Sequence, residues 1–387
     1  MATDRCHELA KLWPAESHFP THLSLPLDFR HPDRAAEAIV AAAQSSPWSA
    51  IVPSSDETAL IASLATERLG LPGNSPEATY AARNKLQMRE RLRAASVPVP
   101  EFAVFSLTDT PSPPEAFPCV VKPLLLSASR GVIRADDPAS LREAFARVTT
   151  LLRRPELAAG EDPAREQILV ESFVDGIEVA LEGILKGGAL EVLALFDKPD
   201  PLDGPYFEET LYVTPSRLPK RVLEALVETA ERAALALGLR EGPVHAELRW
   251  NDRGPWVIEV AARPIGGLCS RTLRFGLGDH SLEELILRRA LGDSTRLPLQ
   301  SGAAGVMMIP IPRAGVLQTV AGETEARAVA GIEAVEITTR IGEKLVPLPE
   351  GASYLGFVFA RADGPQAVEA ALREAHARLR FSIAAVL

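Results

Sequence analysis

Two adjacent apolar segments, each with an acidic residue near its middle, place the strongest constraint on the fold. Residues 244–250 (VHAELRW) and 256–263 (WVIEVAAR) are rich in strand-forming residues and are separated by a short polar turn. This pattern predicts an antiparallel hairpin, in which side chains alternate between the two faces. The polar residues of each strand then share one face: His245, Glu247 and Arg249 on the first strand, Glu259 and Arg263 on the second.

The register of this hairpin depends on its turn. A three-residue loop of Asp252, Arg253 and Gly254, with Gly254 in the left-handed region, places Glu247 directly opposite Glu259. Facing carboxylates between apolar strands repel each other unless a cation lies between them, and oxygen ligands on adjacent strands suit Mg²⁺. The alternatives are a solvent-exposed face, where acidic residues are harmless, and a register shifted by one residue, which separates the two acids.

Charge and composition exclude several classes of partner. The 387 residues carry a formal net charge of −10 without a basic cluster, whereas nucleic-acid binding needs a concentrated positive surface. No apolar run approaches the ~18 residues of a membrane-spanning helix, and the first residues lack the apolar core of a signal peptide. Cys6, Cys119 and Cys269 are too scattered for a disulfide framework or a zinc site. We therefore expect a cytoplasmic protein without nucleic-acid or membrane partners.

The N-terminal region alternates helical and extended patterns. Residues 34–43 and 56–71 predict helices, the second with Asp56 as its N-cap and Gly70 near its end, and residues 48–54 (WSAIVPS) predict a short buried strand. This alternation predicts part of a parallel α/β unit. No convincing strand opens the chain. We therefore expect a domain shortened at its N-terminus, either because the fold is trimmed or because the start codon is assigned late.

The remaining pattern predicts a mixture of helices and strands. Helices are expected at 75–100, 138–152 and 219–238, and strands at 119–123, 168–174 and 177–188. The Pro- and Asp-rich loop at 197–207 is longer than a simple connection requires, which favours a binding role.

A lysine lies within a strand that is apolar enough to be buried. Lys122 is the polar residue of CVVKP, and a lysine is rarely buried without an anionic partner. It either contacts a phosphate or lies on an edge strand and reaches water. The loop from Ser127 to Gly131 follows, and its small residues have amides that can cradle phosphates. The sequence contains no GxxxxGK[ST], GxGxxG, HExxH or GxSxG motif.

Two further acids lie close to strand ends. Glu171 ends an apolar strand, and Glu178 follows seven residues later. An acid at such a hinge can accept hydrogen bonds from an adenine amino group or from ribose hydroxyls. The alternative is that both acids are simply solvated.

Taken in order, five segments resemble the ATP-grasp superfamily, and within it the amino acid (dipeptide) ligase-like branch. These are RNKLQMRERLRAASVPVP, VVKPLLLSASRGV, ILVESFVDGIEVALEG, VHAELRW and IEVAARPIGG, and the resemblance covers roughly residues 40–385. It implies an α/β ATP-grasp fold with a partial N-terminal parallel α/β domain (1–80). An ATP-grasp domain with an antiparallel catalytic sheet (81–295, lid subdomain about 110–175) and a C-terminal α/β subdomain (296–387) would follow.

The resemblance also implies roles for the residues that match the family pattern. Lys85 and Lys122 would contact ATP phosphates, and Glu171, with the backbone of Phe173 and Val174, would bind adenine. A flexible loop would close over the phosphates; it contains Ser127, Ser129, Arg130 and Gly131. The remaining assignments are Glu178 for ribose, Glu247 and Glu259 for Mg²⁺ or Mn²⁺, and Arg263 for the transferring phosphoryl group.

Two positions depart from the pattern of many ATP-grasp enzymes. Their second metal site reads Glu-x-Asn-Pro-Arg, whereas here Ala261 replaces the asparagine, as in the Ala-Ala-Arg of the amino acid ligases. Ala128 stands where the phosphate loop often has glycine, and alanine restricts φ. Substrate contacts are expected from Glu209, which could hold an ammonium group, and Arg271, which could hold a carboxylate. His245 could act as a base or as a hydrogen-bonded neighbour of the metal ligands.

The resemblance implies an ADP-forming ligase that joins a carboxylate to an amine through an acyl phosphate. An amino acid is the expected substrate, with ATP and Mg²⁺ as cofactors and a homodimer as a possible assembly. The alternatives are an ATP-grasp ligase for another carboxylate, a carboxylase that uses bicarbonate, and a nucleotide-binding protein without turnover.

Overall fold

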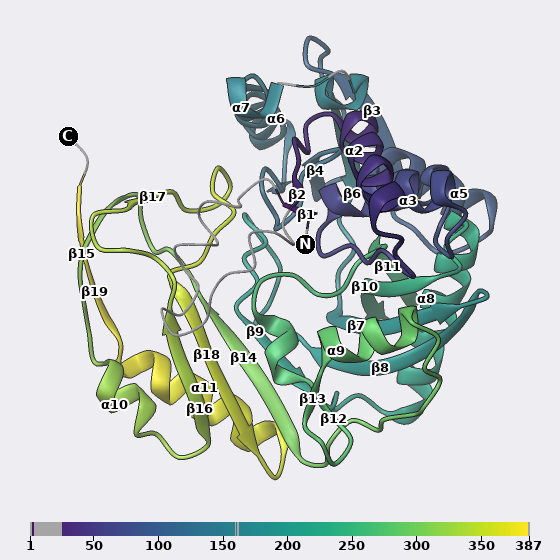
Figure 1. The fold of residues 1–387 in the computed structure, drawn as a ribbon. Coiled ribbons are helices and arrows are strands. Elements are labelled where there is room, and N and C mark those ends of the chain that lie inside the picture. The colour runs from purple at the N-terminus through teal and green to yellow at the C-terminus, as the bar shows by residue number, and fades with distance from the viewer. Residues whose placement is uncertain (1, 4–24, 159, 161, 386–387) are drawn as a thin grey trace.

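The computed structural model describes residues 2–3, 25–158, 160 and 162–385, and its largest element is an eight-stranded antiparallel sheet (Figure 1). The strand order is β11-β10-β7-β8-β9-β14-β18-β16. Their bounds are β7 Ile177–Lys186, β8 Ala189–Asp197, β9 Leu211–Thr214, β10 Gly242–Asn251, β11 Gly254–Ala261, β14 Ala303–Ile309, β16 Ile332–Ile337 and β18 Gly356–Ala362. The predicted antiparallel catalytic sheet is thus confirmed, whereas β8 and β9 were not predicted. Because β9 pairs with β14, one sheet joins the predicted ATP-grasp domain and the C-terminal subdomain.

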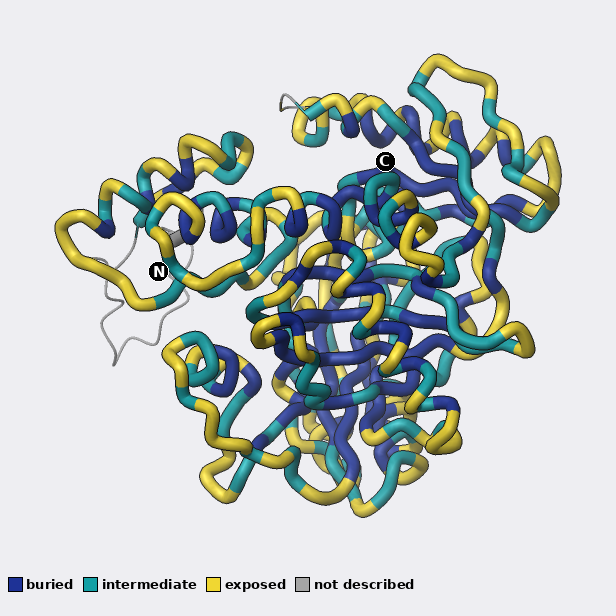
Figure 2. Tube along the Cα trace, turned by 90° about the vertical axis from the view of Figure 1, so that its right-hand side faces the viewer, coloured by how far each residue is buried: buried dark blue, intermediate teal, exposed yellow. Residues whose placement is uncertain are grey.

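Alternation along the central strands separates a packed face from a polar face. Val179 and Leu181 on β7, with Ala246 and Leu248 on β10, pack against helix α8 (Lys220–Leu237). The residues between them point to the opposite face, where the acidic and basic side chains gather. Buried strands form the dark centre of the molecule in Figure 2, and exposed residues lie mainly in the surrounding loops and helices. The polar face of this sheet is therefore where the candidate site lies.

A smaller four-stranded sheet corresponds to the predicted lid. Its order is β3-β6-β4-β5, with bounds β3 Phe102–Ser106, β4 Cys119–Pro123, β5 Ile133–Ala135 and β6 Gln167–Ser172. Helix α6 (Pro138–Leu152) packs on it through Phe145 and Val148, and the short helices α7 (Pro155–Ala158) and η2 (Pro163–Glu166) follow. Strand β4 is buried at all five positions, as its apolar sequence predicts.

The N-terminal region differs from prediction at two segments. Residues 48–54 form no strand, because this stretch, flanked by Pro47 and Pro53, finds no neighbouring strand in the described chain. The helix expected at 75–100 is two helices, α4 (Pro76–Arg83) and α5 (Lys85–Ala94). They separate at Asn84, whose side chain caps α5 by accepting from the Leu86 and Gln87 amides at 3.1 and 3.2 Å.

The other two N-terminal helices follow the prediction more closely. Helix α2 (Pro32–Ser45) contains residues 34–43, and α3 (Asp56–Leu69) ends at Gly70 in the left-handed conformation. The N-cap of α3 is Ser55 rather than Asp56, which is the first helical residue. Parallel pairing in the described residues is limited to the two-residue strands β1 (Ala2–Thr3) and β2 (Leu25–Pro26). Cys6 and most of the expected shortened start lie outside the described residues.

The C-terminal third adds a second small sheet, and helices that pack on the C-terminal strands of the large sheet. Strands β17 (Lys344–Leu345), β15 (Gly315–Ala321) and β19 (Arg380–Ala384) form a three-stranded sheet. Helix α11 (Pro365–Arg378) packs against β14 and β18, and α10 (Glu323–Arg327) contacts α11. Shorter elements are η3 (Cys269–Thr272), β12 (Arg274–Phe275), β13 (His280–Ser281) and α9 (Leu282–Ala290). Among the described residues, none of the helices combines the length and apolar character needed to cross a membrane.

Candidate active site

A cleft of about 350 Å³ lies on the polar face of the large sheet and collects most of the predicted site residues. The lid contributes β4 and the loop after it, and the N-terminal region contributes the start of α3. The predicted residues that line the cleft are Lys85, Lys122, Ser127, Ser129, Glu171, Phe173, Val174, Glu178, Glu209, His245, Glu247, Glu259 and Arg263. Three predicted residues, Arg130, Gly131 and Arg271, lie outside its lining.

The facing carboxylates are present, although the turn that joins their strands differs from prediction. Asn251 pairs with Gly254, so that the hairpin turns through two residues instead of three. Leu248 pairs with Val257, yet Glu247 pairs with Glu259, and Ile258 is therefore the extra residue of a β-bulge. The bulge restores the register that a three-residue loop would have given. Two oxygen-donor side chains thus lie on one face, a donor set that suits Mg²⁺.

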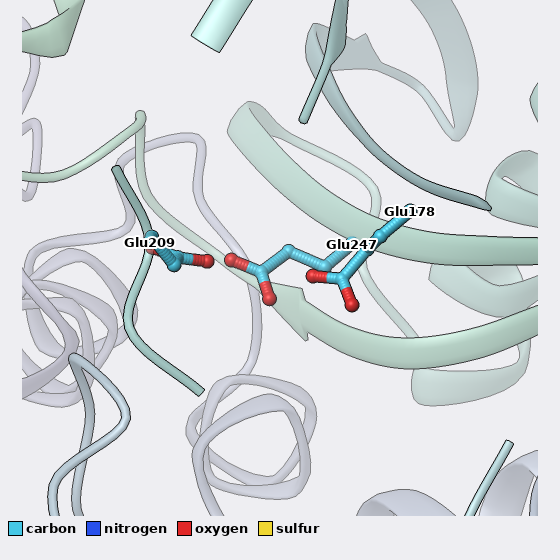
Figure 3. A group of neighbouring side chains, drawn as sticks. All are labelled: Glu178, Glu209 and Glu247. Carbon is cyan, nitrogen blue, oxygen red and sulfur yellow. The ribbon is translucent and has the colours of Figure 1, made fainter. Parts of the chain in front are cut away.

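One member of this pair, Glu247, also belongs to a group of three carboxylates around a lysine that the sequence analysis missed. Glu178, Glu209 and Glu247 point towards one another (Figure 3), with ligand oxygens within 4.8 Å. The Lys198 ammonium lies among them, 2.8 Å from Glu178 Oε1 and 3.4 Å from Glu247 Oε1, and it also contacts Glu209. The sequence does contain a signal for Lys198. This lysine directly follows the apolar strand β8, and Lys122 likewise belongs to an apolar strand, β4.

The electrostatics of the cluster distinguish two of its acids. Burial and the nearby Glu247 charge raise the pKa of Glu209 to about 7. Although burial opposes ionisation, Lys198 and the hydrogen bond from His245 hold the pKa of Glu247 well below its usual range. The two carboxylates interact strongly, so their protonation is a property of the pair. The cluster therefore keeps Glu247 charged and leaves Glu209 to exchange a proton near neutrality.

His245 is a buried, charged neighbour of the predicted metal ligands. Its Nδ1 contacts the Glu182 carboxylate, and its Nε2 lies 3.3 Å from Glu247 Oε1. Burial opposes a charged imidazole, but the Glu182 and Glu247 carboxylates outweigh it and raise the pKa of His245 to about 9. A protonated imidazole has no lone pair to accept a proton. His245 lies between Glu182 and Glu247, and its role as a base or as a neighbour of the metal ligands stays a prediction.

The buried Lys122 has the anionic partner that its position requires. Its ammonium contacts the Glu171 carboxylate, which also accepts from Arg89 Nε at 2.8 Å. Arg89 is fully buried, and its Nη2 donates to the main-chain oxygen of Ile258 at 2.7 Å. Although burial opposes ionisation, Arg89 and Lys122 lower the pKa of Glu171 to about 2. The Glu171 carboxylate is thus paired with two protein cations. One of them, Arg89, also connects it to Ile258, the bulge residue next to Glu259.

Glu178 and the segment expected to bind adenine are fixed by one arginine. Arg249 Nε donates to Glu178 Oε2 at 2.7 Å, and its Nη1 donates to the Val174 carbonyl at 2.5 Å. Its guanidinium lies 5.2 Å from the centre of the Phe173 ring. The sequence placed Arg249 on the same face as His245 and Glu247 without giving it a role. The structure makes it the residue that holds Glu178 and the Val174 main chain in place.

The small-residue loop after β4 curves over one end of the cleft. Ala128 and Ser129 have φ values of +54° and +53°, in the left-handed region that alanine and serine seldom adopt. Ser127 and Ser129 line the cleft, whereas Arg130 and Gly131 bond to the C-terminal subdomain. The replacement of glycine by Ala128 therefore falls at a residue where the backbone conformation favours glycine.

The surroundings differ among three further basic residues of the predicted site, Lys85, Arg263 and Arg271. Lys85 Nζ donates to the Leu126 carbonyl at 2.7 Å and lies 3.8 Å from Glu259 Oε2. Arg263 Nε lies 2.9 Å from Asp56 Oδ2, and both side chains line the cleft. Arg271 instead pairs with Glu336 on the surface, where its side chain is 47% exposed. Arg271 was expected to hold a substrate carboxylate; it lies outside the lining of the cleft, and that role stays a prediction.

The fold of the described residues is the ATP-grasp fold, and comparisons with family models agree. Residues 115–272 match the family model of the ATP-grasp domain. Residues 307–384 match the model of the L-amino acid ligase C-terminal domain 2. Residues 115–272 are therefore similar to ATP-grasp domains, and the C-terminal region is similar to that of L-amino acid ligases.

Individual relatives fall in the same group. The crystal structure of an L-amino acid ligase from Bacillus licheniformis superposes with a TM-score of 0.80 at 27% identity, covering 98% of this chain and 95% of that one. Alanine–anticapsin ligase of Bacillus subtilis is 30% identical over 268 residues, which are 62% of this chain and 56% of that protein. An uncharacterised protein of Sinorhizobium fredii, y4rH, is 28% identical over 319 residues, 81% of this chain and 64% of its own length. The chain thus spans between half and two thirds of these two curated relatives.

Proposed function

We propose that this protein is an ADP-forming ligase that uses ATP to join the carboxylate of one substrate to the amine of another. The observation that carries the proposal is the convergence of two buried lysines, two facing glutamates and an arginine in one cleft. Phosphoryl transfer is catalysed mainly by positioning and by neutralising charge, which is what such a set supplies. The names of the ligases similar to this chain support the same reaction class.

For the nucleotide, we propose that the phosphates lie between Lys85 and Lys122, beneath the loop that carries Ser127 and Ser129. Adenine would lie along the main chain after β6, against Phe173 and Val174. Because Glu171 is held by Arg89 and Lys122, we assign it a supporting role in which it fixes the Lys122 ammonium. Glu178, held by Arg249 and Lys198, lies where the ribose would end.

For the metal, we propose that Glu247 and Glu259 hold Mg²⁺ or Mn²⁺. The bound cation would polarise the phosphates and neutralise part of their charge. Ala261 contributes no donor, so water and phosphate oxygens would complete the coordination shell. His245 orients Glu247, and Lys85 approaches Glu259. Arg263, held by Asp56 from the N-terminal region, would stabilise the transferring phosphoryl group.

For the substrates, we propose that at least one is an amino acid. Glu209 lies at the end of the cleft bounded by Tyr212, Tyr354 and Met308, where a carboxylate can accept hydrogen bonds from a substrate ammonium. The substrate carboxylate would attack the terminal phosphate of ATP and release ADP. The amine would then displace phosphate from the acyl phosphate and form the amide. Since ATP is supplied inside cells, we place the reaction in the cytoplasm.

The test is release of ADP and phosphate by the purified protein with Mg²⁺-ATP and amino acids offered singly and in pairs. Mass spectrometry of the same mixtures identifies the amide. Release that requires two amino acids, with one amide per ADP, supports the ligase. Release with bicarbonate alone would indicate a carboxylase instead. Nucleotide binding without release under any condition would indicate a protein without turnover.

A further inference from the structure

Three segments that are far apart in the sequence meet at Arg147. This residue lies on α6 of the lid. Its Nε and Nη2 donate to the Glu350 carboxylate at 2.5 and 2.9 Å, and its Nη1 contacts the Tyr206 hydroxyl. Tyr206 belongs to the long loop after β8, and Glu350 belongs to the segment between β17 and β18. We call these three side chains the Arg147 junction.

The C-terminal segment of this junction also holds the phosphate loop through its main chain. The Gly131 amide donates to the Pro349 carbonyl at 2.8 Å, and Arg130 Nε donates to the Glu350 carbonyl at 2.9 Å. Both acceptors are main-chain atoms, so the loop follows wherever this segment is held. A bidentate arginine–carboxylate pair fixes both distance and direction. The Arg147–Glu350 side-chain pair therefore sets the position of the loop through the main chain of the segment that carries Glu350.

The other two segments of the junction contribute to the lining of the cleft. Phe207 directly follows Tyr206, and Tyr354 lies four residues beyond Glu350; both line the cleft. The lid is also tied to the long loop by the Arg134 amide, which donates to the Pro205 carbonyl at 2.9 Å. A substrate that packs against Phe207 or Tyr354 therefore acts on the same two segments that hold the lid.

The charges of the pair support a fixed contact. Burial opposes ionisation of Glu350, but the hydrogen bonds and the charge of Arg147 together outweigh it and lower the pKa of Glu350. Those bonds raise the pKa of Arg147. Both groups are therefore charged around neutral pH. The side chains are 43% and 21% exposed, and pairs of this kind contribute little to global stability. Their removal is expected to leave the protein folded.

We propose that Arg147 and Glu350 are positioning residues that keep the phosphate loop closed over the nucleotide when the segments lining the substrate end of the cleft are in place. This inference rests on the proposed ligase function. An acyl phosphate hydrolyses readily, so a lid must exclude water until the amine arrives. When the loop opens early, water displaces phosphate from the acyl phosphate and returns the free carboxylate. ATP is then converted to ADP without formation of an amide.

The first experiment measures the loop and needs no knowledge of the substrates. Hydrogen–deuterium exchange is followed for the peptide containing residues 127–132 in the wild type, Glu350→Gln and Arg147→Ala. Exchange at this peptide is expected to rise severalfold in both variants, while exchange in β7 and β10 stays unchanged. The matched control is Glu333→Gln, which removes a surface pair with Arg361 in the same subdomain. Unchanged exchange in Glu350→Gln would overturn the proposal.

The second experiment measures coupling with the substrate pair that the wild type uses. In Glu350→Gln the ratio of ADP to amide is expected to rise above one. The KM for ATP should increase about tenfold, as is usual when a group that orients a binding element is removed. Exchanging the charges, as Arg147→Glu with Glu350→Arg, should restore part of the coupling, whereas Glu333→Gln should behave as the wild type. A ratio of one and an unchanged KM in Glu350→Gln would overturn the proposal.

The two experiments separate the failure of this inference from the failure of the proposed function. If the wild type forms no amide from any pair, the ligase function fails, and the exchange measurement alone decides whether the junction holds the loop. If the wild type forms one amide per ADP and the variants do the same, the ligase stands and the junction has no positioning role.

Discussion

Glu247 faces Glu259 across the β10–β11 hairpin only because the second strand contains one extra residue, Ile258. With the observed two-residue turn and no bulge, Glu247 would face Ile258, and the Glu259 side chain would point to the other face of the sheet. The bulge is also held from outside the hairpin, since the Ile258 carbonyl accepts from Arg89 Nη2. The geometry of the proposed metal site therefore depends on a buried arginine in α5.

If the facing acids hold the metal, replacing one of them should abolish both binding and turnover. We expect Glu259→Gln to lower the rate of ADP formation by about 100-fold or more, because it removes transition-state charge stabilisation. Electron paramagnetic resonance of free Mn²⁺, titrated with the protein and an ATP analogue, measures the loss of metal directly. Glu333→Gln, on the surface, is the control. Normal ADP production by Glu259→Gln would contradict the assignment.

Removing Arg89 should destabilise the protein strongly. Arg89→Met leaves the buried Glu171 with one cation instead of two and frees the Ile258 carbonyl; breaking a buried pair in this way costs about 3–5 kcal/mol. Arg93→Met on the same helix breaks an exposed pair with Glu101, worth about 0–1 kcal/mol, and a cation–π contact with Phe102, worth about 0.5–1 kcal/mol at an exposed site. Urea unfolding followed by circular dichroism compares the two. Equal midpoints would show that the buried pair contributes nothing.

The same ion pair predicts how stability responds to acid. The pKa of Glu171 falls from an unperturbed 4.5 to about 2 in the folded protein. A lowered carboxyl pKa stabilises the fold above the unfolded value, and this contribution is lost as the pH falls from about 4.5 towards 2. We expect Glu171→Gln to be less stable than the wild type at pH 7, with a difference that shrinks over this acid range. Thermal unfolding measured from pH 7 to pH 3 tests the sign.

The proton on Glu209 should control affinity for a substrate ammonium. With its pKa raised to about 7, Glu209 is protonated below neutrality and negatively charged above it. If the carboxylate binds an ammonium group, the KM of that substrate should fall as the pH rises through about 7. Glu209→Gln should raise this KM and flatten its pH profile. A profile of unchanged shape in the variant would mean that another group titrates there.

Two substitutions in the loop from Ser127 to Gly131 test its backbone conformation in opposite directions. Gly131 has a φ of +76°, and a Cβ there would lie 2.7 Å from Pro123 Cγ, so Gly131→Ala should displace the loop and weaken ATP binding. Ala128 has a φ of +54°, where an alanine is strained by about 1 kcal/mol. Ala128→Gly should lower the KM for ATP by up to about fivefold. Nucleotide titration of both variants measures the two effects, and a tighter-binding Gly131→Ala would contradict them.

The local sequence pattern was sufficient to predict features that depend on a single strand or helix. The apolar run of β4 predicted a buried lysine, and alternation predicted that His245 and Glu247 share a face. Helix α6 was predicted with its observed bounds, because its amphipathic spacing and proline start need no information from distant residues. These features depend on residues within about one turn or one strand.

Prediction failed where contacts with residues distant in the sequence determine the local structure. Residues 48–54 have a strand-like composition but no partner strand, and a strand exists only through hydrogen bonds to another. The hairpin turn was predicted with one residue too many, and the β-bulge in the second strand was not predicted. The correct facing pair was therefore reached through two compensating differences.

The sequence by itself indicated the ATP-grasp fold through five segments that resemble that superfamily in order, and it indicated most of the lysines and acids that line the cleft, because alternation along each strand fixes the face on which a side chain lies. Only the tertiary structure decided what each of those side chains contacts. The Glu171 carboxylate is satisfied by Arg89 and Lys122, and Lys198 lies among three acids that come from different strands and loops. Such contacts join residues between 11 and 82 positions apart, and the free energy of a buried charge depends on all of its neighbours at once.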